Sequence, residues 1–259
     1  MEIFNGISNT ERQERLLQLL EHEGRISVAQ ICQQFDVSEA TARRDLEILA
    51  GEGQLRRVHG GAIALRQAPP ELPIHERSRE QSAEKRRIGV HAAALVQPGQ
   101  TIFLGSGSTV AEMAASLREV PDLTVITNSL QVVNALALAR DLYIVCLGGY
   151  FRPSELSFIG HLTEQALAEV RADLVFIGTR AIDIESGLTN AYLPETMTDR
   201  AILRIGREVI LLADHTKCGR ISTAFLAPVT AVHILVTDDL TSEEFSAALE
   251  AQGVRVLRA

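Results

Sequence analysis

Apolar residues at helical spacing mark two short helices near the start of the chain. Leu16, Leu19 and Leu20 form an apolar stripe behind Thr10, which we expect to cap the first helix with Gln13 in the capping-box position. Gly24 would end this helix. Ser27 would then cap a second helix that runs to Phe35, so the pattern predicts two helices joined by a tight connection.

A third helix is predicted to begin after Ser38, its cap, which follows a turn at residues 36–37. Ala42 and Leu46 lie one helical turn apart and would face the core. Arg43 and Arg44 are then turned away from that core, near the N-terminal half of the helix. Two adjacent arginines are therefore expected on the outer surface.

Residues 55–65 carry the signal of a β-hairpin, with β-branched residues around a Gly60-Gly61 turn. Three helices and a hairpin predict a winged helix-turn-helix over residues 1–66. A helix-turn-helix used only for packing or dimerisation is the alternative, but paired outward arginines followed by a basic wing favour DNA. The third helix would meet base edges and phosphates, and the wing would contact the DNA backbone. The candidate DNA-binding residues are Ser38, Thr41, Arg43, Arg44, Arg56, Arg57 and His59.

The remainder of the chain alternates short β-rich runs with helical stretches. Residues 67–82 contain Pro69, Pro70 and Pro73 without periodicity and are interpreted as a linker. Residues 83–259 are predicted to form βαβ units and a mostly parallel α/β domain. The expected strands are 101–104, 124–127, 143–147, 174–178, 208–213, 233–237 and 254–257, and the expected helices are 111–117, 131–140, 163–170, 199–207 and 242–252.

Composition restricts the class of protein. With 46% hydrophobic residues, the chain can form a large core, and no apolar run reaches the ~20 residues of a membrane span. Charged residues interrupt the first 20 positions, so we expect no signal peptide and a cytoplasmic location. Cys32, Cys146 and Cys218 lack metal-type spacing, and neither a metal nor another cofactor is expected.

Charge argues against a protein that coats nucleic acid non-specifically. The net charge is -8, and residues 1–66 hold 8 Arg against 10 Asp and Glu, so even this part is slightly acidic. The arginines of the third helix and the wing nevertheless cluster in its second half.

A glycine- and hydroxyl-rich loop follows the first strand of the second domain. Its two glycines allow a ligand close to the backbone, and its hydroxyls lie beside free N–H groups at a helix N-terminus, an arrangement that suits a phosphate. A tight turn with serine capping and no ligand is the alternative. No lysine follows the last glycine, so this is not a Walker loop, and the GxGxxG dinucleotide pattern is absent as well. The candidate residues are Gly105, Ser106, Gly107, Ser108 and Thr109.

Similar polar clusters follow other strands. Because the carboxyl ends of parallel strands meet at one edge of a sheet, these clusters are expected to converge on a single crevice. Arg152 and Lys217 are the cationic candidates there. The further candidate residues after these strands are Asn128, Ser129, Gly148 and Gly149.

Two stretches, SEATARRDLEIL (38–49) and GQLRRVHGGA (53–62), closely resemble the DNA-binding signature of DeoR-type bacterial regulators. The resemblance continues into that family's sensor domain through EK (84–85), GSGST (105–109), TNSL (127–130), LGG (147–149), GLT (187–189) and ADHTKCG (213–219). It implies a transcription regulator, usually a repressor of a sugar or carbohydrate operon, that a phosphorylated sugar or related metabolite releases from operator DNA. A homodimer or homotetramer would bind repeated half-sites.

The sensor region also resembles ribose-5-phosphate isomerase, whose phosphate loop has the same form as GSGST. This raises the alternative of an isomerase-like enzyme with an appended DNA-binding domain. The isomerase has two acids where this chain has Ile177 and Arg180, so we expect the pocket to bind a phosphate without catalysis, and we expect the protein not to be an enzyme. The resemblance places Asp199 where the isomerase has a catalytic Glu, which makes Asp199 a further candidate for ligand binding. Many DeoR members carry an acid at Gly105 and a lysine at Asp199 or Arg200, so the effector's identity stays open.

Overall fold

A computed structural model describes residues 8–51, 54–64 and 68–259, without the side chains of Glu21, His22 and Arg56. The chain divides into two compact units, Met1–Arg66 (unit 1) and Gln67–Ala259 (unit 2). None of the helices in the described residues is long and apolar enough to cross a membrane.

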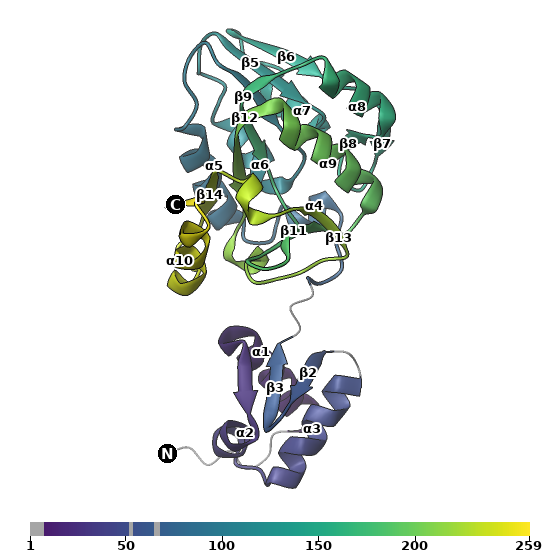
Figure 1. Cartoon of the computed structure of the whole chain (residues 1–259), viewed down its shortest axis with the longest axis vertical. Coiled ribbons are helices and arrows are strands. Elements are labelled where there is room, and N and C mark those ends of the chain that lie inside the picture. The colour runs from purple at the N-terminus through teal and green to yellow at the C-terminus, as the bar shows by residue number, and fades with distance from the viewer. Residues whose placement is uncertain (1–7, 52–53, 65–67) are drawn as a thin grey trace. The chain divides into compact units, whose positions relative to one another are not determined.

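Unit 1 is a winged helix-turn-helix, as predicted. Three helices and a three-stranded antiparallel sheet in the order β1-β3-β2 enclose one small core (Figure 1). Leu16, Ile31 and Leu46 are fully buried in it, one from each helix. The elements are α1 (Asn9–Glu23), β1 (Arg25–Ser27), α2 (Val28–Phe35), α3 (Glu39–Gly51), β2 (Leu55–Val58) and β3 (Gly61–Ala64).

Helix caps in unit 1 follow the sequence with one exception. The prediction that Thr10 caps α1 is wrong: the hydroxyl of Ser8 accepts a hydrogen bond from the Glu11 amide at 3.2 Å, because Ser8 and Glu11 have the spacing of a capping box. Ser27 forms the predicted cap, and its backbone amide donates a hydrogen bond to the side-chain oxygen of Gln30. Strand β1 was not predicted, because three residues are too few to show alternation.

Unit 2 has a seven-stranded, fully parallel sheet between two layers of helices, which confirms the predicted α/β class. Alternate residues of β4 face opposite cores: Ile102 and Leu104 belong to the core formed with α5, α6 and α7, and Phe103 belongs to the core formed with α8, α9 and α10. The strands are β4 (Thr101–Leu104), β5 (Leu123–Thr127), β6 (Leu142–Cys146), β9 (Ala172–Ile177), β12 (Gly206–Leu212), β14 (Ile234–Thr237) and β15 (Arg255–Arg258). The helices are α5 (Ser82–Ala93), α6 (Ser108–Ala115), α7 (Leu130–Leu136), α8 (His161–Ala168), α9 (Leu193–Ile205) and α10 (Glu243–Ala251).

Strand order places a switch point beside β4. The sheet runs β15-β14-β12-β9-β4-β5-β6, so the chain builds outward in one direction through β5 and β6 and in the other through β9, β12, β14 and β15. At such a reversal the loops after neighbouring strands diverge and leave a crevice at the carboxyl edge. The loops that follow β4, β9 and β12 therefore surround one space.

Small elements that the sequence pattern did not predict complete unit 2. They are a short helix, a hairpin and a second antiparallel sheet in the order β10-β11-β13, none with enough residues to show periodicity. Their bounds are α4 (Ile74–Arg77), β7 (Tyr150–Arg152), β8 (Ser157–Ile159), β10 (Ala181–Asp183), β11 (Gly187–Asn190), β13 (Ala224–Ala227) and the 3-10 turns His215–Lys217 and Val229–Ala231.

Residues 68–82, the described part of the predicted linker, do not form a free connection between two domains. This part packs within unit 2. The amide of Ala68 donates a hydrogen bond to the carbonyl of Ile221 at 2.8 Å, and the amide of Ile74 donates one to the carbonyl of Ser154 at 2.8 Å. Prolines explain the error, since they remove periodicity and backbone donors without preventing the segment from packing through its side chains and carbonyls.

Candidate functional site

The outer face of α3 presents the paired arginines as predicted. Arg43 and Arg44 are exposed. Arg43 lies 3.4 Å from Glu39 in an exposed ion pair one helical turn apart. Arg44 makes no ion pair with any described residue, so its guanidinium is available to an incoming phosphate or base.

The other predicted DNA-binding residues divide into structural and exposed groups. Ser38 accepts a hydrogen bond from the amide of Thr41 at 3.2 Å and so caps α3. Arg57 leans onto α3, where it donates to the carbonyl of Arg43 at 3.2 Å and lies 3.5 Å from Glu47. His59 is exposed at the turn of the hairpin. The side chain of Arg56 lies outside the described part of the structure.

In unit 2, the loop after β4 forms one wall of a pocket at the carboxyl edge of the sheet. Gly107 has φ 129° and ψ 147°, a conformation that favours glycine, and it turns the chain into α6. The first helical bond of α6 runs from the Ala111 amide to the Gly107 carbonyl, so the amides of Ser108 and Thr109 lack helical partners. This wall concentrates hydrogen-bond donors at the positive end of a helix.

Two lysines lie at the same pocket. Lys85 is buried and donates to the carbonyls of Arg77 at 2.5 Å and Glu80 at 2.7 Å. Lys217 lines the pocket, and burial lowers the pKa of both ammonium groups, opposed in each case by the nearby carboxylate of Asp214. An anion in the pocket would oppose this loss of charge.

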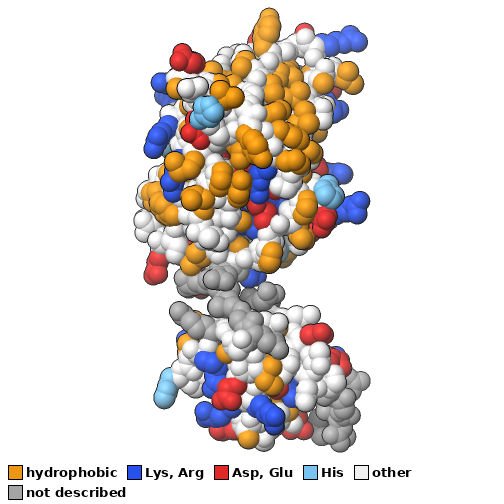
Figure 2. All heavy atoms as spheres, turned by 90° about the vertical axis from the view of Figure 1, so that its right-hand side faces the viewer, with side chains coloured by type: hydrophobic (Ala, Val, Ile, Leu, Met, Phe, Trp, Pro, Cys, Tyr) orange, Lys and Arg blue, Asp and Glu red, His pale blue; other side chains and the backbone are white. Residues whose placement is uncertain are grey.

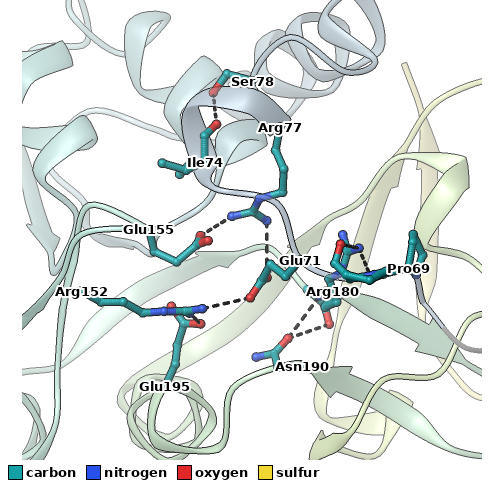
Figure 3. A network of polar contacts seen from close by, with 12 residues as sticks. Pro69, Glu71, Ile74, Arg77, Ser78, Arg152, Glu155, Arg180, Asn190 and Glu195 are labelled. Atoms are coloured by element: carbon teal, nitrogen blue, oxygen red, sulfur yellow. Dashed lines mark hydrogen bonds and ion pairs between the residues drawn. The ribbon is translucent and has the colours of Figure 1, made fainter.

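A network of arginines and glutamates forms another wall (Figure 3). Glu71 contacts both Arg77 and Arg152, Arg77 also contacts Glu155, and Arg152 also contacts Glu195. Burial raises the pKa of Glu155 to about 7, against the opposing effect of Arg77. It also raises the pKa of Glu195. Three carboxyls thus share two guanidinium groups in a poorly solvated site.

Polar side chains from β11 and α9 continue the lining. The side chain of Asn190 donates a hydrogen bond to Asp199 at 2.8 Å, and its Oδ1 accepts one from the backbone amide of Arg180 at 3.2 Å. Burial, followed by the charge of nearby Glu195, raises the pKa of Asp199 well above its ordinary value. A protonated Asp199 can donate a hydrogen bond as well as accept one.

Several buried polar atoms of this region lack a partner among the described residues. They are Nε of Arg77, Nε of Arg180 and Oε1 of Glu155. Arg180 is only 6% exposed and Glu155 only 3%. Buried polar groups are normally satisfied, so three unsatisfied atoms at one pocket point to a polar ligand.

The structure brings together Gly105, Ser106, Gly107, Ser108, Thr109, Asp199 and Lys217 among the predicted ligand-binding residues. Arg152 reaches the pocket through its ion pairs with Glu71 and Glu195, which line it.

The other four predicted residues have structural contacts instead. Asn128 donates to the carbonyl of Phe158 at 2.9 Å, and Ser129 caps α7. The carbonyl of Gly148 accepts from Thr163 at 2.9 Å. A Cβ on Gly149 would lie 2.1 Å from the hydroxyl of Thr163, so a glycine is needed there for close packing.

The sequence reasoning did not select Glu71, Arg77, Lys85, Glu155, Arg180, Asn190, Glu195 or Asp214 as site residues, although all of them line the pocket. Most lie outside the loops that follow the predicted strands. Lys85 and Asp214 stand inside motifs that carry the family resemblance, which is the one signal that could have selected them.

Comparison with known proteins gives the same division of the chain. The DeoR-like helix-turn-helix domain matches residues 12–68, and the DeoR C terminal sensor domain matches residues 80–239. Transcriptional repressor AccR of Agrobacterium fabrum is 33% identical over 240 residues, covering 92% of each chain. The glycerol-3-phosphate regulon repressor of Escherichia coli is 32% identical over 232 residues, covering 90% of this chain and 92% of the repressor.

Among solved structures, ribose 5-phosphate isomerase A of Methanocaldococcus jannaschii is a weak match, with 20% identity, a TM-score of 0.39 and coverage of 54% of this chain and 55% of the isomerase. The sequence matches span nearly the whole chain and both of its units. The chain therefore belongs to the DeoR family of DNA-binding transcription regulators, with a helix-turn-helix domain followed by a sensor domain.

Proposed function

We propose that this regulator is a cytoplasmic repressor that leaves its operator when a phosphorylated sugar or related metabolite binds the pocket of unit 2. The relatives that support it are named as repressors, one of them of a glycerol-3-phosphate regulon and another, GlcR of Bacillus subtilis, 33% identical over 247 residues. The observation that carries the proposal is the donor-rich loop at the N-terminus of α6, at the switch point of the sheet.

The loop would bind the phosphate. The amides and hydroxyls of Ser108 and Thr109 supply donors, and the amide of Ser106 and the ammonium of Lys217 lie on the same pocket. Asn190 and Asp199 would bind the hydroxyls of the sugar, because each can donate and accept hydrogen bonds when Asp199 is protonated.

The test begins with a thermal-shift screen of phosphorylated sugars and sugar acids, since a ligand of the native state raises its stability by mass action. The double variant Ser108→Ala/Thr109→Ala should then bind the best ligand at least about tenfold more weakly by calorimetry, because charge-assisted hydrogen bonds are lost. Ser116→Ala, at the exposed C-terminal end of α6, is the control. Equal affinity in the double variant would assign the phosphate to another part of the pocket.

Operator binding is proposed to depend on the face of α3 that carries Arg44. Arg44→Ala should abolish specific binding to an operator duplex recovered by selection from a random library, while unit 2 still binds its ligand. Arg15→Ala, on α1, is the matched control. Unchanged affinity at physiological salt would exclude α3 as the recognition helix.

We propose that the pocket binds without turnover. Arg180 stands where the isomerase resemblance requires an acid, and it donates to the carbonyls of Pro69 and Pro70, which leaves it no role in proton transfer. The purified protein should not interconvert ribose 5-phosphate and ribulose 5-phosphate. Turnover at ordinary enzyme rates, on the order of 1 to 1000 per second, would support the isomerase alternative.

Self-association is proposed through an apolar face of unit 2. Large apolar side chains gather on one side of this unit (Figure 2), where β7, α9 and β13 expose Tyr150, Leu193 and Phe225. Apolar clusters of this kind mark protein contacts, and a second copy of the chain would supply the second helix-turn-helix for a repeated half-site. Sedimentation should show a dimer or tetramer, which Leu193→Glu weakens. A monomer that binds its operator tightly would contradict this.

A further inference from the structure

Glu71 places a carboxylate of the chain itself inside the pocket. It belongs to residues 68–73, which precede α4 and follow unit 1 in the sequence. Oε2 of Glu71 lies 3.0 Å from Nη2 of Arg152, and Oε1 lies 3.7 Å from Nη1 of Arg77, so each oxygen faces a different guanidinium (Figure 3). The side chain is only 14% exposed. The carboxylate of Glu71 thus lies between two arginines on the wall of the pocket that is proposed to bind a phosphate.

The arginines around this carboxylate have unused capacity. Nε of Arg77 and Nε of Arg180 are buried and have no partner among the described residues, although both side chains line the pocket. Arg180 is 6% exposed, and its Nη2 donates to the carbonyls of Pro69 and Pro70, on the same segment as Glu71. A ligand with more oxygens than one carboxylate could satisfy donors that Glu71 leaves unused.

We propose that Arg77 and Arg152 form a second anion site, separate from the loop before α6, and that Glu71 occupies it until an oxyanion of the effector displaces it. The inference rests on the proposed function of the pocket and extends it to regulation. A metabolite that carries a phosphate and a second acidic group would bind the loop with one and the arginine pair with the other.

Displacement of Glu71 would loosen the segment that leads to unit 1. Its anchors are the Glu71 ion pairs, the bonds from Arg180 to the proline carbonyls, and the bond from the Ala68 amide to the Ile221 carbonyl at 2.8 Å. Loss of the Glu71 ion pairs lengthens the stretch of chain that is not held to unit 2, and the effective concentration of a tethered DNA-binding unit falls as its tether lengthens. Effector binding is thereby converted into weaker operator binding.

A purely structural ion-pair network is the competing explanation, and the two differ in their response to Glu71→Gln. This change keeps the shape of the side chain and removes its charge. If Glu71 competes with ligand, the variant binds anions more tightly; if Glu71 only supports the fold, the variant loses stability and gains no affinity.

The experiment titrates inorganic phosphate into the full-length protein by calorimetry. In the Ser108→Ala/Thr109→Ala background, which weakens the loop site, adding Glu71→Gln should raise phosphate affinity at least about tenfold, because one charge-assisted hydrogen bond no longer has to be broken before phosphate binds. Adding Arg152→Gln should abolish the gain. Glu76→Gln, an exposed glutamate on α4, is the matched control and should produce no gain.

Hydrogen exchange provides the second readout. Phosphate should accelerate exchange of the Ala68 and Ile74 amides in the wild-type protein, and Glu71→Gln should do so without phosphate. No gain in affinity together with unchanged exchange would overturn the inference. Failure of the proposed function has a different signature, because the loop changes would then leave wild-type phosphate affinity unaltered whatever happens at Glu71.

Discussion

Asp45 is the residue in unit 1 whose removal we expect to be most damaging. It lies on the inner side of α3, 3% exposed, and forms a paired contact with Arg12 of α1: Nε to Oδ2 at 2.7 Å and Nη2 to Oδ1 at 3.1 Å. Gln13 adds a hydrogen bond to Oδ1 at 3.0 Å. The pair joins α3 to α1, and Asp45→Ala would leave the Arg12 guanidinium buried with the side chain of Asn9 as its one partner among the described residues.

The expected loss is about 3–5 kcal/mol, because removing one partner of a buried ion pair leaves an uncompensated charge in a poorly solvated site. That is a large part of the stability that a unit of this size can have. Replacing both partners, as in Arg12→Met/Asp45→Leu, should restore most of the stability, since the desolvated charges are then absent. Glu47→Ala, on the exposed face of the same helix, should change stability by less than about 0.5 kcal/mol.

Amide hydrogen exchange of α1 and α3 measures this effect, because the protein has no tryptophan and its tyrosines, Tyr143, Tyr150 and Tyr192, all lie in unit 2. Exchange in both helices should accelerate in Asp45→Ala and recover in the double variant, while the tyrosine fluorescence of unit 2 keeps its unfolding midpoint. Protection within about 1 kcal/mol of wild type would show that the pair contributes little net stability, and it would refute the reasoning.

Two further predictions concern unit 2. The pKa of Glu155 is raised from 4.5 to about 7, so the folded state favours its protonated form, and the associated stability is lost as pH rises through about 7. Relative to Glu155→Gln, the wild-type protein should therefore lose about 1 kcal/mol of unfolding free energy between pH 6 and pH 8, measured by urea unfolding. A difference between the two proteins that does not depend on pH would contradict this. Gly149→Ala should destabilise the unit by about 1–3 kcal/mol, because the new Cβ would lie 2.1 Å from the Thr163 hydroxyl and 2.8 Å from the Ile159 carbonyl. Gly148→Ala, with nothing within 4 Å of the added atom, is its control, and equal thermal midpoints for the two variants would show that the contact relaxes freely.

Most of the main elements of the fold could be predicted because their patterns are local, although the 12-residue helix α5 was not among the predicted helices. Strand β4 has the bounds that its short β-rich run predicted, and Ser27 and Ser38 cap helices as their spacing implied. The strands that were missed have three or four residues each: β7, β8, β10 and β11. They form by pairing with segments that are distant in the sequence or that had been interpreted as loops. Tertiary contacts, which no local window contains, determine them.

Apart from Asp199 on α9, which the isomerase resemblance selected, the candidate site was predictable only where it followed a predicted strand. The loop after β4 and Lys217 after β12 line the pocket, because parallel strands end at one edge. Asn128 follows β5, which lies one strand farther from the switch point, and its side chain bonds the β7–β8 hairpin region through Phe158. Glu71 could not be found from pattern, because nothing in a proline-rich segment indicates that one of its carboxylates turns into a pocket.

The acidic balance of unit 1 is less unfavourable to DNA binding than its charge count implies. Asp45 is buried against Arg12, so its charge is compensated locally. Glu39 and Glu47 are exposed and pair loosely with Arg43 and Arg57, contacts that contribute no more than about 1 kcal/mol and that a DNA phosphate can replace. Because these carboxylates compete with every phosphate, non-specific binding should stay weak, and tight binding then requires base contacts from α3. An acidic unit of this kind favours sequence discrimination over general affinity for DNA.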